Sequence, residues 1–431
     1  IKYKIHYYLM IHLFIFLYNL NCFINGYGWV PLLDIKTYNT KKPSEIVVFD
    51  KTLVIWEKNN NIIVQDNACL HRKGPLSEGY IDNDSNNLRC SYHGWEFNEN
   101  GNVLSIPQKE CGKHCKYNQH TYTTELCSDI LWINLNDSYC EFPYHVPNIT
   151  TDTTVVELPY SMNILLENFF DPAHIPFAHH KLQSTRELAS SVNSSINIMN
   201  STTLQLYFED KTLENNEYRN GSMTFYDPCH YELKNIYPDI FVKGLHIYCV
   251  PILPHKTRIF IQQEHNDGIS KIIYSKIPHW IKHVVTQTFL DSDTMLLYKQ
   301  EQHLLKMNSL HNCTKLYTTP TTSDYSVHMF NKWLKKYPKP WSDKIIQTNY
   351  PITRTREDVF DRYNGHTKNC IYCTNTLNIV ENIKRLLLIV LIYNATHNTS
   401  FIDIYSIMFL YLSMNYFENF FLFKNYVHNE L

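Results

Sequence analysis

The chain has 431 residues, of which 44% are hydrophobic and 19% are charged, so it is neither disordered nor a small scaffold. This length exceeds what one hydrophobic core supports, and two or three structural units are expected. The formal net charge of -2 provides no basic field, so we expect no nucleic-acid partner. Twelve cysteines are too sparse for a disulfide scaffold.

Residues 1–26 are expected to be a targeting or hydrophobic leader. Ile5–Ile24 is apolar and aromatic without acidic residues, and it follows Lys2 and Lys4. That is the layout of the first two regions of a signal peptide. A buried helix or a short membrane segment is the alternative.

Residues 27–150 are expected to form a small all-β domain. Short runs with strand character alternate here with polar turn clusters such as Glu57–Asn61 and Asn98–Asn102. The runs are Ile46–Phe49, Leu53–Trp56, Ile62–Gln65 and Leu131–Asn134.

Residues 151–350 mix strand-like and helical patterns, which predicts an α+β domain. The strand-like runs are Ile259–Gln262 and Lys271–Tyr274, the helices are Ser161–Phe170 and Trp280–Lys306, and the proline-punctuated Tyr317–Tyr350 is expected to be a connector.

Residues 351–376 hold a Cys-x-x-Cys segment, and residues 377–431 are expected to be membrane-anchoring helices. Arg385–Tyr393 has only eight consecutive apolar residues, and Phe401–Phe423 is apolar but interrupted by acidic and Asn residues. Neither reaches the roughly 20 clean residues of an unambiguous span. Basic residues flank both, which favours an anchoring hairpin. An amphipathic helical pair packed on the protein is the alternative.

Two short arms each offer one cysteine and one histidine. Cys69-Leu-His71 and Cys90-Ser-Tyr-His93 are eighteen residues apart. Common zinc fingers keep Cys with Cys and His with His, whereas mixed arms can place both Cys on one iron and both His on the other. The spacing therefore favours a Rieske [2Fe–2S] cluster, with a zinc site as the alternative.

A second dense site contains His174 and His179 on a proline-bent segment, with Asp171 one turn before His174. Two His and one carboxylate form the ligand triad of non-haem Fe(II) oxygenases. The third ligand must come from a distant acid. Asp293 on the expected long helix is our choice, and Asp291 is the alternative.

Three groups of residues together resemble a known family. They are the two Cys/His arms, the motif Asn168-x-x-Asp171-Pro172-x-His174-x4-His179, and the segment Asp361-Arg362-Tyr363-x-x-His366-Thr367-x-x-Cys370-x-x-Cys373. The sequence resembles the Rieske-type mononuclear non-haem iron oxygenases. It is most similar to the plastid branch that contains pheophorbide a oxygenase, chlorophyllide a oxygenase and the translocon-associated Rieske protein of the inner envelope.

The resemblance implies an N-terminal all-β Rieske domain, an α+β helix-grip-like catalytic domain and a C-terminal hydrophobic helical tail. It also implies a homotrimer in which Asp171 bridges toward a cluster histidine of the neighbouring subunit, with Asn168 beside the iron. The implied ligands are Cys69, His71, Cys90 and His93 for the cluster, and His174, His179 and Asp293 for a mononuclear Fe(II).

The activity implied is that of a monooxygenase acting on a hydrophobic, chlorophyll-derived tetrapyrrole, as in chlorophyll catabolism. A ferredoxin or a reductase would donate the electrons, and the location would be a plastid membrane, either inner envelope or thylakoid. The alternative is a membrane-anchored Rieske redox sensor or translocon accessory without oxygenase activity.

Cys370 and Cys373 have the spacing of a regulatory dithiol, which a thioredoxin-like partner would reduce. The alternative is two thiols in a turn, or half of a zinc site.

Overall fold

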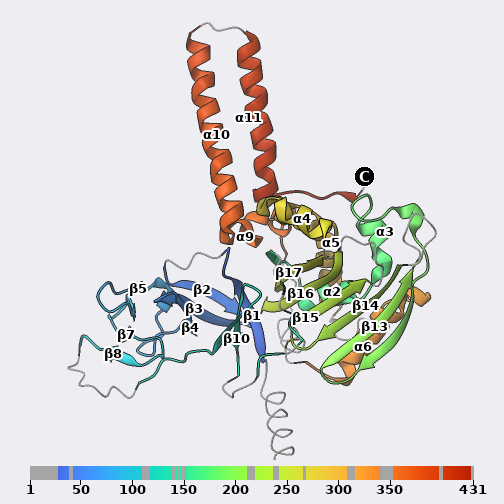
Figure 1. Cartoon of the computed structure of the whole chain (residues 1–431), viewed down its shortest axis with the longest axis horizontal. Coiled ribbons are helices and arrows are strands. Elements are labelled where there is room, and N and C mark those ends of the chain that lie inside the picture. Colours follow the sequence, from blue (N-terminus) through green and yellow to red (C-terminus); the bar gives the residue numbers. More distant parts are fainter. Residues whose placement is uncertain are drawn as a thin grey trace, which may run out of the picture.

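The computed structural model contains a small β domain, a larger domain of one sheet with helices, and a long helical hairpin (Figure 1). The leader expected over residues 1–26 lies outside the described residues. These are 28–37, 42–108, 117–136, 141–143, 145–147, 149, 152–210, 219–235, 242–265, 268–307, 316–339, 341, 353–397 and 401–428.

The N-terminal domain is built from three small antiparallel sheets, with strand orders β1-β10-β9, β2-β3-β4 and β5-β6-β7-β8. Three of the four runs expected to be strands fall within strands, and the fourth, Ile46–Phe49, passes the end of its strand by one residue, so the all-β prediction is confirmed. The strands are β1 (Trp29–Asp34), β2 (Ser44–Val48), β3 (Lys51–Lys58), β4 (Asn61–Asp66), β5 (Tyr80–Ile81), β6 (Leu88–Arg89), β7 (Glu96–Phe97), β8 (Val103–Ser105), β9 (Thr124–Cys127) and β10 (Ile130–Asn134), with a 3-10 turn η1 at Leu76–Glu78.

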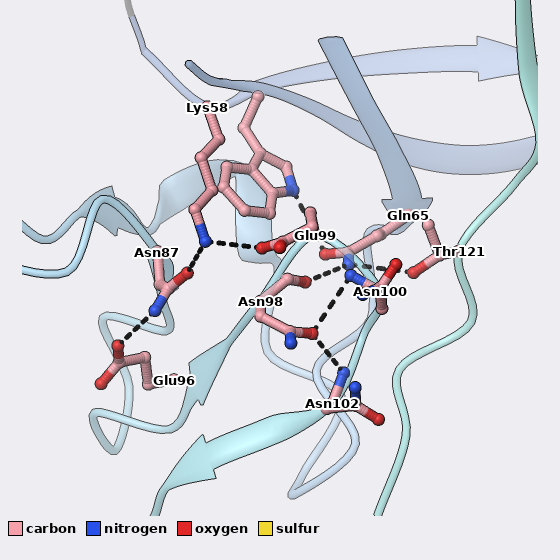
Figure 2. Close-up of polar contacts among 10 residues, drawn as sticks. Lys58, Gln65, Asn87, Glu96, Asn98, Glu99, Asn100, Asn102 and Thr121 are labelled. Atoms are coloured by element: carbon pink, nitrogen blue, oxygen red, sulfur yellow. Dashed lines mark hydrogen bonds and ion pairs between the residues drawn. The ribbon is translucent and has the colours of Figure 1, made fainter. Parts of the chain in front are cut away.

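A buried polar network joins two of these sheets (Figure 2). Gln65 on β4 is fully buried; its Oε1 accepts from Trp56 Nε1 at 3.2 Å, and its Nε2 donates to the Asn98 carbonyl at 2.9 Å. The Asn98 side chain in turn accepts from the backbone amide of Asn102 at 2.8 Å. The network therefore fixes the β7–β8 turn against β3 and β4, and β7 directly follows the second Cys/His arm.

The larger domain contains a seven-stranded antiparallel sheet in the order β11-β17-β16-β15-β14-β13-β12. The strands are β11 (Thr153–Leu158), β12 (Asn193–Met199), β13 (Thr203–Asp210), β14 (Arg219–Tyr226), β15 (His230–Asn235), β16 (Val242–Leu253) and β17 (Lys256–His265). The helices are α2 (Met162–Phe169), η2 (Pro172–His174), α3 (Ile175–Ala178), η3 (Arg186–Leu188), α4 (Ile269–Lys276), α5 (His279–Lys306), η5 (Thr322–Asp324), α6 (Tyr325–Lys336), α8 (Arg356–Val359), α9 (Arg362–Gly365) and η6 (Thr367–Asn369).

The two faces of this sheet have different neighbours. On one face, Tyr231 packs against Phe170 after α2, with ring centroids 5.6 Å apart, and Phe225 packs against Trp333 of α6 at 5.8 Å. On the other, Tyr248 contacts Trp132 of β10 at 4.9 Å. One continuous apolar core thus joins both domains.

Two expectations for this domain were wrong. Lys271–Tyr274 lies in α4, where Ile272 and Ile273 are exposed, so this apolar run joins no sheet. The expected connector Tyr317–Tyr350 contains α6, because its prolines flank the helix instead of interrupting it. Trp333 on α6 is fully buried and donates from Nε1 to the Asn200 carbonyl at 2.6 Å.

The C-terminal hairpin pairs α10 (Ile371–Thr396) with α11 (Phe401–Leu422) and projects away from the two domains (Figure 1). Lys384 and Glu418 form an ion pair across it. Much of its apolar surface is exposed, including Leu386, Ile389, Ile392, Tyr405, Phe409 and Leu412. No helix within the described part of the chain combines the length and apolarity needed to cross a membrane. Membrane anchoring therefore stays a prediction.

Replacing Gln65 with Leu should destabilise the N-terminal domain. The substitution leaves the Trp56 indole N–H buried without an acceptor and removes the donor to the Asn98 carbonyl, at a cost of roughly 1–3 kcal/mol for each such group. Urea unfolding followed by circular dichroism should show a lower midpoint. The matched control is Glu99→Gln, which removes an exposed ion pair to Lys58 worth at most about 1 kcal/mol. Equal midpoints for the two variants would contradict the role given to Gln65.

Candidate metal centres

The two Cys/His arms fold into loops of matching design. In the first, the amide of Cys69 donates to the Gly74 carbonyl at 2.9 Å and the amide of Lys73 donates back to Cys69 at 2.8 Å. In the second, the amide of Cys90 donates to the Trp95 carbonyl at 3.0 Å and the amide of Gly94 donates back to the Cys90 carbonyl at 2.9 Å. Lys73 and Gly94 have φ values of 60° and 73°, in the left-handed region that such tight loops require. Each loop therefore presents its cysteine inward.

The four side chains of the arms are sorted by depth. Cys69 and Cys90 are buried, His71 is exposed and His93 is half-buried. The two imidazole rings lie 4.4 Å apart between centroids, and His71 stacks on Trp95 at 5.0 Å. This arrangement fits a cluster with an inner iron held by sulfur and an outer iron held by nitrogen.

Burial controls the protonation of these ligands. It raises the pKa of the Cys69 thiol to about 11, and the neighbouring Cys90 adds to the shift. A thiolate here therefore depends on a cation such as iron. Burial and the nearby His71 lower the pKa of His93, which keeps its imidazole neutral and able to ligate.

The second candidate centre brings together three side chains from separate elements. His174 ends η2, His179 follows α3 and Asp293 lies on α5. The Nε2 atoms of the two histidines are 3.3 Å apart, and Asp293 Oδ2 lies 3.4 Å from His179 Nε2 and 3.8 Å from His174 Nε2. These donors are close enough to bind one metal ion.

The other ring nitrogen of each histidine is held by a hydrogen bond. His174 Nδ1 donates to the backbone carbonyl of Asp171. His179 Nδ1 donates to Ser292 Oγ at 2.6 Å, because the Ser292 hydroxyl proton is itself given to the Phe289 carbonyl at 2.6 Å. With protons fixed on both Nδ1 atoms, both Nε2 lone pairs face Asp293. Such contacts orient metal ligands and set their tautomers.

Burial removes the side chains of this site from water and disfavours their charged forms. It lowers the pKa of His174 to about 3 and that of His179 to about 4, so both rings are neutral. Burial, and secondarily Asp171, raises the pKa of Asp293 to about 8. The carboxylate form of Asp293 is thus favoured only by a nearby cation, and the donor set fits the iron of a two-histidine, one-carboxylate centre.

The alternative acid, Asp291, has another partner. Its Oδ2 accepts from Arg362 Nε at 2.9 Å and from another guanidinium nitrogen at 2.6 Å. Burial raises the pKa of Asp291 to about 6, against the lowering effect of Arg362. The structure thus brings Asp293, and not Asp291, to the histidine pair.

Asp171 and Asn168 are linked to this site through backbone hydrogen bonds. The Asp171 carboxylate accepts from the Ala173 amide at 3.0 Å, and burial raises its pKa to about 6. Asn168 is half-buried on α2, and its carbonyl accepts from the Asp171 amide at 3.0 Å. The backbone of Asp171 is therefore tied to both α2 and His174.

The segment after α11 also reaches this centre, which the sequence did not reveal. Arg186 donates to the His428 carbonyl at 3.3 Å, and Arg356 donates to the Tyr426 carbonyl at 2.6 Å. The His428 imidazole also donates a hydrogen bond to the Ser292 backbone. The residues concerned lie far apart in the chain, and no local pattern links them.

The expected dithiol is buried. Cys370 and Cys373 are only 3% and 0% exposed, and they face His283 and His366. His283 is a ligand candidate that sequence reasoning missed, because no spacing rule connects it to cysteines 87 and 90 residues away.

Two family models match the chain: "Rieske [2Fe-2S] domain" over residues 28–123 and "Pheophorbide a oxygenase" over residues 225–311. The chain therefore has the domain combination of a Rieske non-haem iron monooxygenase. Its cofactors are accordingly a [2Fe–2S] cluster and a mononuclear iron.

Similar proteins from plants cover most of the chain. Protochlorophyllide-dependent translocon component 52 of Arabidopsis thaliana is 28% identical and covers 83% of this chain and 75% of its own length. Flavonoid 8-hydroxylase 2 of Ocimum basilicum is 27% identical over 80% of this chain and 72% of the hydroxylase. Pheophorbide a oxygenase of Oryza sativa subsp. japonica is 27% identical over 83% of this chain and 74% of the oxygenase. All three are described as chloroplastic.

The fold is also that of solved oxygenases. Dicamba monooxygenase superposes with a TM-score of 0.57 at 14% sequence identity, over 72% of this chain and 96% of that one. This likeness confirms the all-β domain followed by a mixed catalytic domain.

Replacing Asp293 with Ala should remove the mononuclear iron and leave the cluster intact, since the cluster arms lie in the other domain. Metal analysis should show a loss of about one of three irons per chain, with an unchanged electron paramagnetic resonance (EPR) signal from the reduced cluster. Asp291→Asn should keep all three irons but lower the stability by about 3–5 kcal/mol, because the buried Arg362 loses its partner. Loss of the mononuclear iron in Asp291→Asn, with all three irons retained in Asp293→Ala, would assign the third iron ligand to Asp291.

Proposed function

We propose that Cys69, His71, Cys90 and His93 hold the cluster of this oxygenase, and that His174, His179 and Asp293 hold its iron. The observation that carries the proposal is the convergence of two lone pairs and one carboxylate in a buried site, with both histidine tautomers fixed. When bound, the cluster supplies single electrons, and the iron supplies the place where dioxygen is reduced and one oxygen atom enters the substrate.

The protein's own residues would prepare that site. Ser292 and the Asp171 backbone hold the two imidazoles in position, which limits reorganisation when metal binds. The buried surroundings that lower the histidine pKa values also keep bulk water from the reaction.

The arrangement of the domains supports electron delivery between subunits. The loops around β5 and β7 lie at one end of the molecule and α3 lies at the opposite end (Figure 1). The cluster of one chain is therefore too far from the iron of the same chain to be its direct electron donor. We propose a homotrimer in which Asp171 bridges toward a cluster histidine of the neighbouring subunit, with ferredoxin or a reductase as donor and Asn168 beside the iron.

The substrate proposed is a chlorophyll-derived tetrapyrrole. Two of the similar proteins carry tetrapyrroles in their names, pheophorbide a oxygenase and protochlorophyllide-dependent translocon component 52, which supports this class and a plastid location. The name of the flavonoid 8-hydroxylase supports flavonoids as the competing substrate class. The complete His174/His179/Asp293 set favours an oxygenase over a redox sensor or translocon accessory. Membrane attachment of the hairpin and a thioredoxin partner stay predictions.

The function is tested by single-turnover assays on the full chain. Pre-reduced protein mixed with dioxygen should hydroxylate or cleave one of a panel of pheophorbides and chlorophyllides, with label from ¹⁸O₂ in the product. A flavone serves as the comparison substrate. Labelled flavone product without labelled tetrapyrrole would overturn the substrate, and re-oxidation of the cluster without any product would favour the redox sensor.

Replacing Asp171 with Asn tests the bridging role. Asn retains the backbone carbonyl that holds His174, so both metal centres should remain. The amide no longer offers a carboxylate to a neighbouring imidazole, and steady-state turnover should fall by about 10- to 100-fold. Asp324→Asn is the matched control, because Asp324 caps η5 and has no assigned role at the iron. Unchanged turnover in Asp171→Asn would contradict the proposed bridging role of Asp171.

A further inference from the structure

We propose that His283, His366, Cys370 and Cys373 form a structural zinc site, separate from both iron centres. The four residues come from α5, the end of α9 and the start of α10. All four are buried, and one donor atom from each lies within 4.8 Å of every other. Two thiolates and two imidazoles are a standard tetrahedral zinc set.

The distances fit the edges of one coordination tetrahedron. His283 Nδ1 lies 3.4 Å from Cys370 Sγ and 3.5 Å from Cys373 Sγ, and His366 Nε2 lies 3.3 Å from Cys373 Sγ. With Zn–S near 2.3 Å and Zn–N near 2.0 Å, tetrahedral geometry gives N···S edges of about 3.5 Å. One ion at the centre could therefore reach all the donors without backbone movement.

The tautomer of His366 is set for binding. Its Nδ1 lies 2.6 Å from the backbone carbonyl of Val155, which can only accept, so Nδ1 carries the proton. The lone pair of the neutral ring is then on Nε2, which faces Cys373. A ligating histidine usually makes this contact to a carbonyl or carboxylate with its second nitrogen.

His283 points its Nδ1 at both sulfur atoms. The ring is 1% exposed, and its Nε2 has no hydrogen-bond partner among the described residues. Burying an imidazole whose Nε2 has no partner costs free energy, and a strong contact at Nδ1 would offset part of that cost. Thiols alone are weak hydrogen-bonding partners. A bound cation would supply that contact.

The surroundings suit a neutral site of this kind. Cys370 and Cys373 belong to a small apolar cluster with Leu377 and Phe421. A divalent cation balances two thiolates, whereas two uncompensated thiolates in such a cluster would be costly. A cavity of about 440 Å³ is lined by His283, His366 and Cys370, which provides a path for an ion to enter.

Four protein donors leave no open position, which distinguishes this site from a catalytic one. The ion would connect α5 to the base of the α10–α11 hairpin. Asp293 lies on the same helix, ten residues after His283. Zinc would thus hold in place the helix that carries the candidate iron ligand, and coordinated thiolates would not be available as a regulatory dithiol.

The test is metal analysis of the full chain, with zinc and iron counted separately. Purified protein should contain about one zinc per chain besides its iron, and X-ray absorption at the zinc edge should show two sulfur and two nitrogen neighbours. Cys373→Ser and His366→Gln should each lower zinc at least about fivefold. Cys249→Ser is the matched control, since Cys249 is equally buried but lies in β16, and it should keep the zinc.

Wild-type measurements keep the proposal testable if those variants misfold. A mercurial reagent should release zinc from the native protein, and Co²⁺ added to the zinc-free protein should give the visible absorption of a tetrahedral thiolate site. Zinc-free native protein in which Cys370 and Cys373 form a disulfide, or are alkylated as rapidly as exposed thiols, would overturn the proposal. Iron in this site would also overturn it. Because iron is counted independently, loss of the zinc proposal would leave the proposed oxygenase untouched.

Discussion

Helix α5 buries polar side chains that other elements need, and the rest of the catalytic domain depends on these contacts. Asp291 pairs with Arg362 of α9, Ser292 accepts from His179, and Glu301 accepts from the amide of Ser161 at the start of α2 at 2.9 Å. Each group would be costly to bury alone, so its partner is effectively required. A rotation of α5 by one residue would break these pairs together, which fixes the position of Asp293.

A second constraint is common to the candidate centres. The rings of His174, His179 and His366 each donate a hydrogen bond from one nitrogen to a neighbouring oxygen acceptor. The remaining nitrogen keeps its lone pair directed toward a carboxylate or a thiol. Because these rings are oriented before any metal binds, little reorganisation accompanies binding. The polar network around Gln65 has a comparable role in the N-terminal domain, where it supports the turn that follows the second cluster arm.

Much of this arrangement was open to sequence reasoning. The Cys/His arms are local motifs, and the His174/His179 pair lies on one short segment, so spacing together with the family resemblance was enough to propose them as ligands. Contacts between distant segments were not accessible in this way: His283 approaches Cys370 only because α5 packs against the start of α10. Local apolar runs also misled at α4, since a β-branched run indicates a strand whether or not a neighbouring strand is available to pair with it.

The central claim is that one chain holds two iron centres of different kinds. Mössbauer spectroscopy of reduced protein enriched in ⁵⁷Fe tests it most directly, because coupled and isolated irons give separate signals. The account predicts two cluster irons for every isolated high-spin ferrous iron, with the isolated signal lost when His174 and His179 are replaced. Cluster iron alone in the fully loaded wild-type protein would contradict it.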